Sequence, residues 1–319
     1  MEATLDTGIP RIDGRNLIVY PGLVNTHHHF FQAFVRNQLA LEWSTLSLVD
    51  WLDRIYRIFS LINEDCIYHS SMVSMAELLK HGCTTAFDHQ YCFNKHAGSY
   101  LIDRQFEAAE RIGMRFVAGR GTNTLPRDEG STMPEQMLES TDDYLRDCER
   151  IIREYHDGEP FAMRSVALAP CQPINCRPET FTETLSLARA HDLSMHTHLS
   201  EGENAVMLAR YGKRSLDWCI DVGFCGPDVW IAHGWEMSRE EMFRMAEHDI
   251  GLSHCGFPSG LGGGGSQDMV PAQCSVGMNG SVRHRQGAKC NPNLPCSVVP
   301  GHLPQCLVGG QCVDTGLTA

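Results

Sequence analysis

Short apolar runs alternate along the chain with longer segments in which apolar residues recur at helical spacing. The short runs predict seven strands, at residues 23–29, 84–90, 115–121, 165–170, 193–199, 229–233 and 251–255. Between them the pattern predicts helices, most clearly at residues 65–80, 101–112, 178–190 and 238–248. In the last of these, Ser238 and Glu241 have the spacing of a capping box, which indicates where that helix begins.

Repeated alternation of strand and helix is typical of an α/β fold with a parallel sheet and crossover helices. Seven strands at this spacing predict a (β/α)8 barrel of the TIM type that is incomplete, since no eighth strand can be recognised. The active-site groups of such a barrel lie at the carboxyl ends of the strands, where several of the predicted strands carry histidine. A doubly wound sheet is the alternative, although histidines at so many strand ends would be unusual for it.

The character of the sequence changes after Cys255. Residues 256–319 hold 13 of the 29 glycines but only two acidic residues, and no helical period runs through them. Such a segment cannot readily bury enough apolar surface to offset the entropy lost on ordering. We therefore expect an amino-terminal remnant at residues 1–20, a barrel at residues 21–255, and an irregular or frame-altered tail at residues 256–319. An altered reading frame after Cys255 would explain the change in composition. Translating the gene in all three frames past this codon tests that hypothesis, which fails if no frame restores an eighth strand.

Composition limits the partners and the compartment. A formal net charge of −13 argues against nucleic acid, which binds basic surfaces. No run of about 18 apolar residues is present, so no membrane span is expected. The first residues lack the basic-then-apolar pattern of a signal peptide, and several cysteines lie in apolar periodic segments where reduced thiols are expected. These features predict a cytoplasmic protein and leave a homo-oligomer open.

The first segment with candidate chemistry contains His27, His28 and His29 at a strand end. Alternate residues of a strand share a face, so His27 and His29 are expected to point together and His28 away from them. Two imidazoles on one face make half of a zinc or iron site. A chance cluster is the alternative.

The second segment reads His196-Thr197-His198-Leu199-Ser200-Glu201. Glu201 follows His198 by three residues, just past the strand end, where its carboxylate could take a proton from a water bound to a metal. A helix-start carboxylate is the alternative for Glu201. Two further strands end in histidine: His233 could orient the water or polarise the attacked centre, and His254 fits a structural role equally well.

The segments PGLVNTHHHFFQ, HTHLSE, WIAHGWE and GLSHC, in this order, resemble the amidohydrolase superfamily. They look closest to its 8-oxoguanine and isoxanthopterin deaminases, and triazine hydrolases are more distant relatives of that branch. The resemblance spans about residues 15–255. It implies that His27, His29 and His198 bind the metal, that Glu201 shuttles protons, and that His233 lies beside the hydrolytic water.

The same resemblance implies that Gln32 contacts a heterocyclic substrate, a solvated amide being the alternative. Two features depart from the family pattern. In the family, an aspartate at the end of the eighth strand is the fourth metal ligand, and no such aspartate is found here. The most similar segment carries the neutral Asn279 at that position. The small β-sandwich that usually precedes the first strand is also not recognisable.

The expected activity is hydrolysis of a C–N bond other than a peptide bond, by deamination of an aminated purine- or pterin-like heterocycle. The expected cofactor is one divalent metal ion, with zinc favoured over iron. A triazine-type hydrolase is the second hypothesis, and an incomplete barrel that binds metal without turnover is the third. The expected partner is the small heterocyclic substrate alone.

Overall fold

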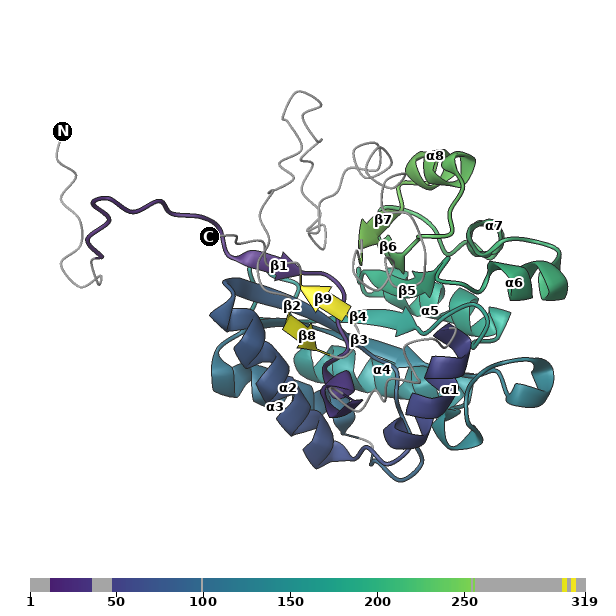
Figure 1. Ribbon diagram of the computed structural model, residues 1–319, viewed down its shortest axis with the longest axis horizontal. Coiled ribbons are helices and arrows are strands. Elements are labelled where there is room, and N and C mark those ends of the chain that lie inside the picture. Colours follow the sequence, from purple (N-terminus) through teal and green to yellow (C-terminus); the bar gives the residue numbers. More distant parts are fainter. Residues whose placement is uncertain are drawn as a thin grey trace.

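The computed structural model describes residues 12–35, 48–98, 100–253 and 255, together with the backbone of residues 306–308 and 311–313. Its main sheet holds seven strands in chain order, and each strand is parallel to the next (Figure 1). The strands are β1 (Leu23–Asn25), β2 (Cys83–Gln90), β3 (Arg115–Thr122), β4 (Arg164–Pro170), β5 (Met195–Leu199), β6 (Val229–His233) and β7 (Gly251–Ser253).

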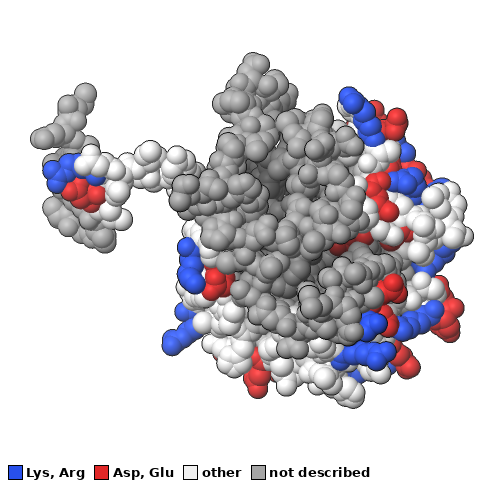
Figure 2. Space-filling model, in the orientation of Figure 1, with Lys and Arg blue, Asp and Glu red and all other residues white. Residues whose placement is uncertain are grey.

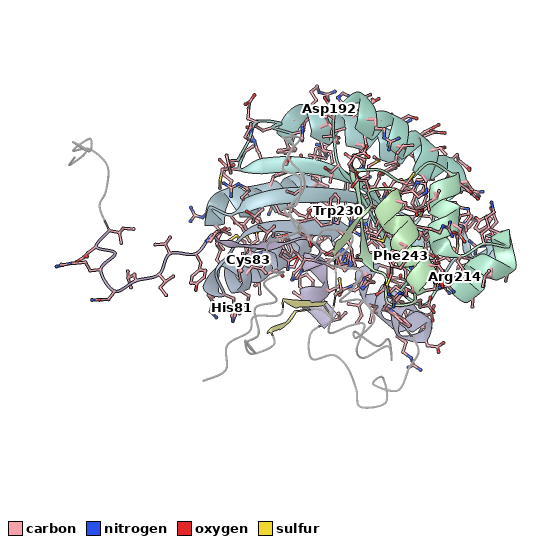
Figure 3. All side chains as sticks on the ribbon, turned by 90° about the horizontal axis from the view of Figure 1, so that it is seen from above. His81, Cys83, Asp192, Arg214, Trp230 and Phe243 are labelled. Carbon is pink, nitrogen blue, oxygen red and sulfur yellow. The ribbon has the colours of Figure 1, made fainter. Side chains whose placement is uncertain are left out.

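Helices connect the strands and cover the outer face of the sheet (Figures 1 and 3). They are α1 (Leu48–Phe59), α2 (Glu64–Lys80), α3 (Leu101–Ile112), α4 (Thr141–Tyr155), α5 (Pro178–Ala190), α6 (Asn204–Tyr211), α7 (Ser215–Asp221) and α8 (Arg239–Glu247). Short 3-10 helices are η1 (Phe30–Val35), η3 (Arg127–Glu129) and η4 (Glu135–Met137). The capping box predicted at Ser238 and Glu241 is present at the start of α8.

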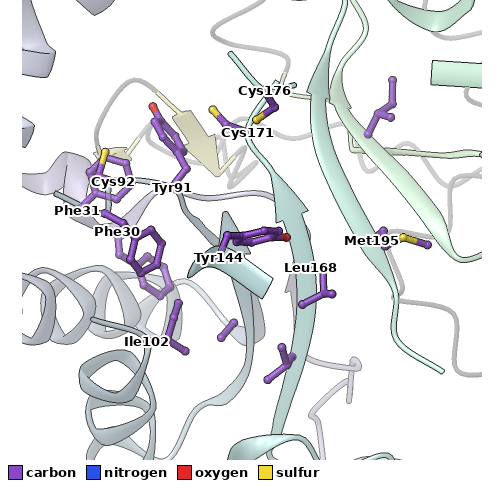
Figure 4. Packing of buried hydrophobic residues seen from close by; sticks show 14 of the residues in the cluster. Phe30, Phe31, Tyr91, Cys92, Ile102, Tyr144, Leu168, Cys171, Cys176 and Met195 are labelled. Carbon is purple, nitrogen blue, oxygen red and sulfur yellow. The ribbon is translucent and has the colours of Figure 1, made fainter. Parts of the chain in front are cut away.

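Strand residues alternate between two apolar cores. Phe87 of β2, Val117 of β3 and Ala167 of β4 form a small cluster on the inner face, against which Trp230 of β6 packs. Their neighbours along the strands belong to the large cluster between sheet and helices, part of which is drawn in Figure 4. This is the two-sided burial expected of strands inside a barrel.

The sheet curls until its two edge strands meet at their carboxyl ends. The hydroxyls of Thr26, just after β1, and Ser253, which ends β7, lie 2.7 Å apart. The indole Nε1 of Trp230 donates to the carbonyl of Thr26 over 3.1 Å. The fold is therefore the predicted TIM-type barrel in incomplete form, with seven parallel strands in the part of the chain described.

Three predicted strands are shorter than expected. The first ends at Asn25 rather than residue 29, because the Asn25 side chain accepts the backbone N–H of His27 over 3.1 Å and turns the chain out of the ladder. The fifth begins at Met195 rather than residue 193, and the seventh ends at Ser253 rather than residue 255. The other four strands lie within one residue of the predicted bounds.

Most of the predicted tail, including Asn279, lies outside the described residues, as does His254. Within that tail, β8 (Cys306–Val308) and β9 (Gln311–Val313) pair antiparallel. The division of the chain at Cys255 stays a prediction. None of the described helices combines the length and the apolar character that crossing a membrane requires. Acidic and basic side chains are interspersed over the described part of the face in Figure 2.

Candidate metal centre

The three histidines predicted as ligands lie together inside the barrel. His198 is on β5, and His27 and His29 follow β1. The ring centroids are 4.8 Å apart for His27 and His29, 4.9 Å for His27 and His198, and 5.0 Å for His29 and His198. One nitrogen from each lies within 4.8 Å of the others, which is close enough for a shared metal ion.

Hydrogen bonds to the backbone orient two of these rings. Nδ1 of His29 lies 2.8 Å from the carbonyl of His89, and Nδ1 of His198 lies 2.8 Å from the carbonyl of Cys171. Because a carbonyl only accepts, each Nδ1 carries the proton and each Nε2 of the neutral ring presents a lone pair. The two Nε2 atoms face each other at 3.0 Å. Facing lone pairs repel unless a cation lies between them, so this arrangement fits a divalent metal.

Burial keeps these imidazoles in the neutral form that binds metals. It lowers the pKa of His198 to about 4 and the pKa of His27 and His29 well below the usual range, with the neighbouring histidines adding to the effect on these two. Nε2 of His27 is buried without a hydrogen-bond partner. A buried nitrogen lone pair is costly unless something binds it. The donor set is therefore three neutral nitrogens, which suits zinc and iron alike.

Glu201 and His233 lie beside this cluster. Nε2 of His233 is 3.2 Å from a carboxylate oxygen of Glu201, and the His233 ring stacks on His198 with centroids 5.4 Å apart. Alternation along β6 would turn His233 toward the helices, like Ile231 and unlike Trp230. Its φ of +75° reverses that direction. Such a left-handed backbone is costly for a residue other than glycine, and strain of this kind gathers at functional sites.

Two further carboxylates hold the loop that carries Glu201. Glu203 accepts the backbone N–H groups of Ser200 and Glu201 over 2.5 and 2.6 Å. Glu236, three residues after His233, accepts those of Gly202 and Asn204 over 3.0 and 3.2 Å. The ends of β5 and β6 are thus tied together. Burial, and secondly the charge of Glu203, raises the pKa of Glu201 well above its usual range.

Gln32 is buried on η1, with 4% of its surface exposed, and its backbone N–H donates to the carbonyl of His29 over 3.0 Å. The predicted alternative of a solvated amide is therefore wrong. Among the described residues, the carboxylate of Glu201 is grouped with His198 but not with His27 and His29, and the place of the fourth ligand stays a prediction. Three other groups of side chains lie equally close together: His27, His233 and Cys255; His27, His89 and His196; and His198, Glu201 and His233.

Two further histidines, for which the sequence predicts no role, also face the interior of the barrel. His196 contacts His27, and His89 stacks on His198 with centroids 4.6 Å apart. Tyr91 packs edge-on against both His29 and His198. Figure 4 shows Tyr91 and Cys171 near each other at the carboxyl end of the strands. The spacing of His196 and His198 could have indicated that both face inward, because residues two apart on a strand share a face.

Known proteins share this fold and these segments. The model of the amidohydrolase family matches residues 18–292. Hydroxydechloroatrazine ethylaminohydrolase of Pseudomonas sp. (strain ADP) is 51% identical over 96% of this chain and 64% of its own length. The 8-oxoguanine deaminase of Pseudomonas aeruginosa is 36% identical over 77% of this chain and 54% of its own.

Among solved structures, atrazine chlorohydrolase from Arthrobacter aurescens TC1, complexed with zinc, superposes with a TM-score of 0.74. It is 28% identical over 79% of this chain and 57% of its own length. The chain thus spans between half and two thirds of the length of these relatives. The family model covers the whole predicted barrel, residues 21–255, and with it all the predicted site segments. The chain belongs to the amidohydrolase family.

Proposed function

We propose that this protein hydrolyses a bond between a ring carbon and an exocyclic nitrogen of a nitrogen heterocycle. The observation that carries the proposal is the convergence of His27, His29 and His198, with Glu201 and His233 beside them. Three neutral nitrogens next to a carboxylate are what hydrolysis by an activated water requires.

A divalent metal, with zinc favoured, would be held by Nε2 of His27, His29 and His198. When bound, it supplies the Lewis acidity that makes water a nucleophile at neutral pH. The chain's own contribution is to present the three lone pairs already oriented, since the Nδ1 protons of His29 and His198 are held by backbone carbonyls.

Glu201 moves the proton. Its carboxylate accepts a proton from the attacking water and delivers it to the heterocycle, so that the amine can leave. A pKa raised by burial suits this exchange, because an acid–base group works best when its pKa is close to the working pH. We assign to His233, whose Nε2 lies 3.2 Å from that carboxylate, the stabilisation of the oxygen that gains negative charge.

The relatives support two candidate classes of substrate. The 51% identity to an ethylaminohydrolase named for hydroxydechloroatrazine favours an alkylamino-substituted triazine. The 36% identity to an 8-oxoguanine deaminase keeps an aminated purine or pterin as the second candidate. Gln32, which is buried and bonds to the carbonyl of His29 through its backbone N–H, is the residue we assign to contact the heterocycle.

The Glu201→Gln variant tests the assignment. It should lower turnover by at least about 100-fold, since general acid–base groups contribute on the order of 10²–10⁴. Metal content, measured by elemental analysis, should stay at the wild-type level because Glu201 is not assigned as a ligand. Release of amine and of ammonia from triazines, purines and pterins is the activity readout. Retention of most of the activity would refute the role of Glu201.

The same assay separates the enzyme from an inactive metal-binding barrel. Wild-type protein that contains about one equivalent of metal but releases no amine from any member of the panel would support the inactive barrel. Wild-type protein that folds but binds no metal, even when zinc is added, would contradict both. The Gln32→Ala variant should then raise KM more than it lowers kcat if Gln32 contributes binding alone.

A further inference from the structure

His196 is a fully buried histidine that the proposed reaction does not use. It lies on the inner face of β5, two residues before His198. Its Nε2 is 2.7 Å from Nδ1 of His27, and its Nδ1 is 3.0 Å from the carbonyl of Trp230 on β6. It therefore connects a predicted ligand to the backbone of a neighbouring strand.

The direction of both hydrogen bonds follows from the carbonyl at one end. Because the Trp230 carbonyl only accepts, Nδ1 of His196 carries the proton, and the Nε2 of this neutral ring has a lone pair. Nδ1 of His27 must then donate to it, which leaves the lone pair of His27 on Nε2. That nitrogen is the one buried without a hydrogen-bond partner.

The three predicted ligands differ in what fixes them. His29 and His198 donate to backbone carbonyls, which no side-chain substitution at the acceptor can remove. His27 instead donates to the side chain of His196. Partners of this kind set the tautomer and the ring direction of a metal-binding histidine, and losing one typically lowers metal affinity by about 10–100-fold.

We propose that His196 is a positioning residue that fixes His27 in the tautomer and orientation required for metal binding. This rests on the metal site of the proposed function. Without His196, the Nδ1 proton of His27 loses its acceptor, and the ring can turn or exchange its proton to Nε2, which removes the lone pair from the site.

Two substitutions at this position separate its two hydrogen bonds. In His196→Asn, the shorter amide can still donate to the Trp230 carbonyl but cannot reach His27, so we expect zinc to bind about 10–100-fold more weakly. In His196→Gln, the longer side chain can place its oxygen near the former Nε2 and accept from His27. This variant should stay within about fivefold of the wild type, well short of the loss typical of a missing partner.

The matched control is His89→Asn. His89 is equally buried and donates Nε2–H to the carbonyl of Ala169 over 2.8 Å. Among the described residues, it contacts the predicted ligands by ring packing on His198 and through its backbone carbonyl, which the substitution keeps, and not by a side-chain hydrogen bond. The readout is the zinc dissociation constant, measured by competition with a chromophoric chelator on metal-free protein. Thermal melts of each variant without metal verify folding.

Equal weakening in His196→Asn and His89→Asn would overturn the proposal, since general damage to the barrel interior would explain both. Zinc binding by His196→Asn at wild-type affinity would overturn it as well. Neither result would touch the proposed function, which fails only if the wild-type protein binds no metal or releases no amine. Weak binding by the asparagine variant alone, recovered in the glutamine variant, supports the proposal.

Discussion

At the scale of single residues, Asp88 shows how the segment that carries the ligands is held in place. Asp88 is fully buried on the outer face of β2. It accepts the backbone N–H of Phe30, the first residue of η1, and Nε2 of Gln105 on α3, both over 2.5 Å. The carboxylate thus anchors the residue that directly follows His29. Burial raises its pKa from 3.8 to about 7 despite these two donors.

The sign of the pH dependence follows from that shift. Between pH 4 and pH 7 the folded protein binds the Asp88 proton more tightly than the unfolded chain does, so this group lowers stability as the pH rises through that window. The Asp88→Asn variant removes the effect. Its new amide can donate to Oε1 of Gln105, which has no hydrogen-bond partner of its own.

We therefore expect the difference in unfolding free energy, variant minus wild type, to grow by about 1–4 kcal/mol from pH 4.5 to pH 7.5, at about 1.4 kcal/mol per pKa unit. Urea unfolding of both proteins at several pH values measures it. A difference that does not change with pH would show that Asp88 keeps an ordinary pKa.

Residues of this kind could not be found from the sequence. Glu201 was found because it lies three residues from His198, within one local segment. The contacts of His196 with His27 and of Asp88 with Phe30 join residues 169 and 58 positions apart. No local pattern encodes a partner at such a distance. The left-handed backbone of His233 is equally invisible, because alternation along the strand predicts the opposite direction.

At the scale of elements, Arg120 ties the third strand to the fourth helix. It is almost fully buried on β3 and binds Glu139, just before α4, and Asp147 on α4, each over 2.7 Å. Its guanidinium also lies 3.4 Å from the ring centroid of Phe93. Removing one member of a buried ionic network leaves the others without compensation, which is more costly than losing an exposed ion pair.

The Arg120→Met variant should therefore lose about 3–5 kcal/mol of unfolding free energy, because the largely buried Glu139 would lose its cation and Asp147 would keep only its ion pair with Arg150. The matched control is Arg146→Met on α4, whose ion pair with Asp143 is largely exposed and should contribute less than about 0.5 kcal/mol. Denaturant unfolding compares the two. Similar losses of unfolding free energy in both variants would show that the buried ionic network contributes no more to stability than an exposed ion pair.

The elements themselves were largely predictable. Four strands and the helices of residues 101–112 and 178–190 follow the predicted bounds, because their apolar periods run unbroken to a turn residue. The first strand was predicted too long since its apolar run continues past Asn25, whose side chain ends the ladder by a local hydrogen bond. Strand ends therefore depend on side-chain capping that hydrophobic periodicity does not record.

At the scale of the whole molecule, the candidate metal site joins parts of the barrel that lie far apart in the sheet. His27 and His29 follow β1, whereas His198 belongs to β5, four strands away in the sheet order. The hydroxyls of Thr26 and Ser253 join the two edge strands at the same end. A metal held by these histidines would therefore cross-link the barrel at its carboxyl end as well as serve chemistry.

Metal removal should for this reason destabilise the whole fold. Without a cation the Nε2 lone pairs of His29 and His198 face each other at 3.0 Å, and Nε2 of His27 stays buried without a partner. A ligand present at about 1,000 times its dissociation constant stabilises the folded state by about 4 kcal/mol. For a chain of this size that corresponds to a fall in Tm of about 10 °C on chelation, measured by calorimetry and reversed by excess zinc. The His198→Ala variant, which lacks one ligand, should melt at nearly the same temperature with and without chelator. If wild-type protein gives up its metal to the chelator and its Tm does not change, the metal binds the folded barrel no more tightly than it binds the unfolded chain, and the hydrogen bond between Thr26 and Ser253 joins the two edge strands without its help.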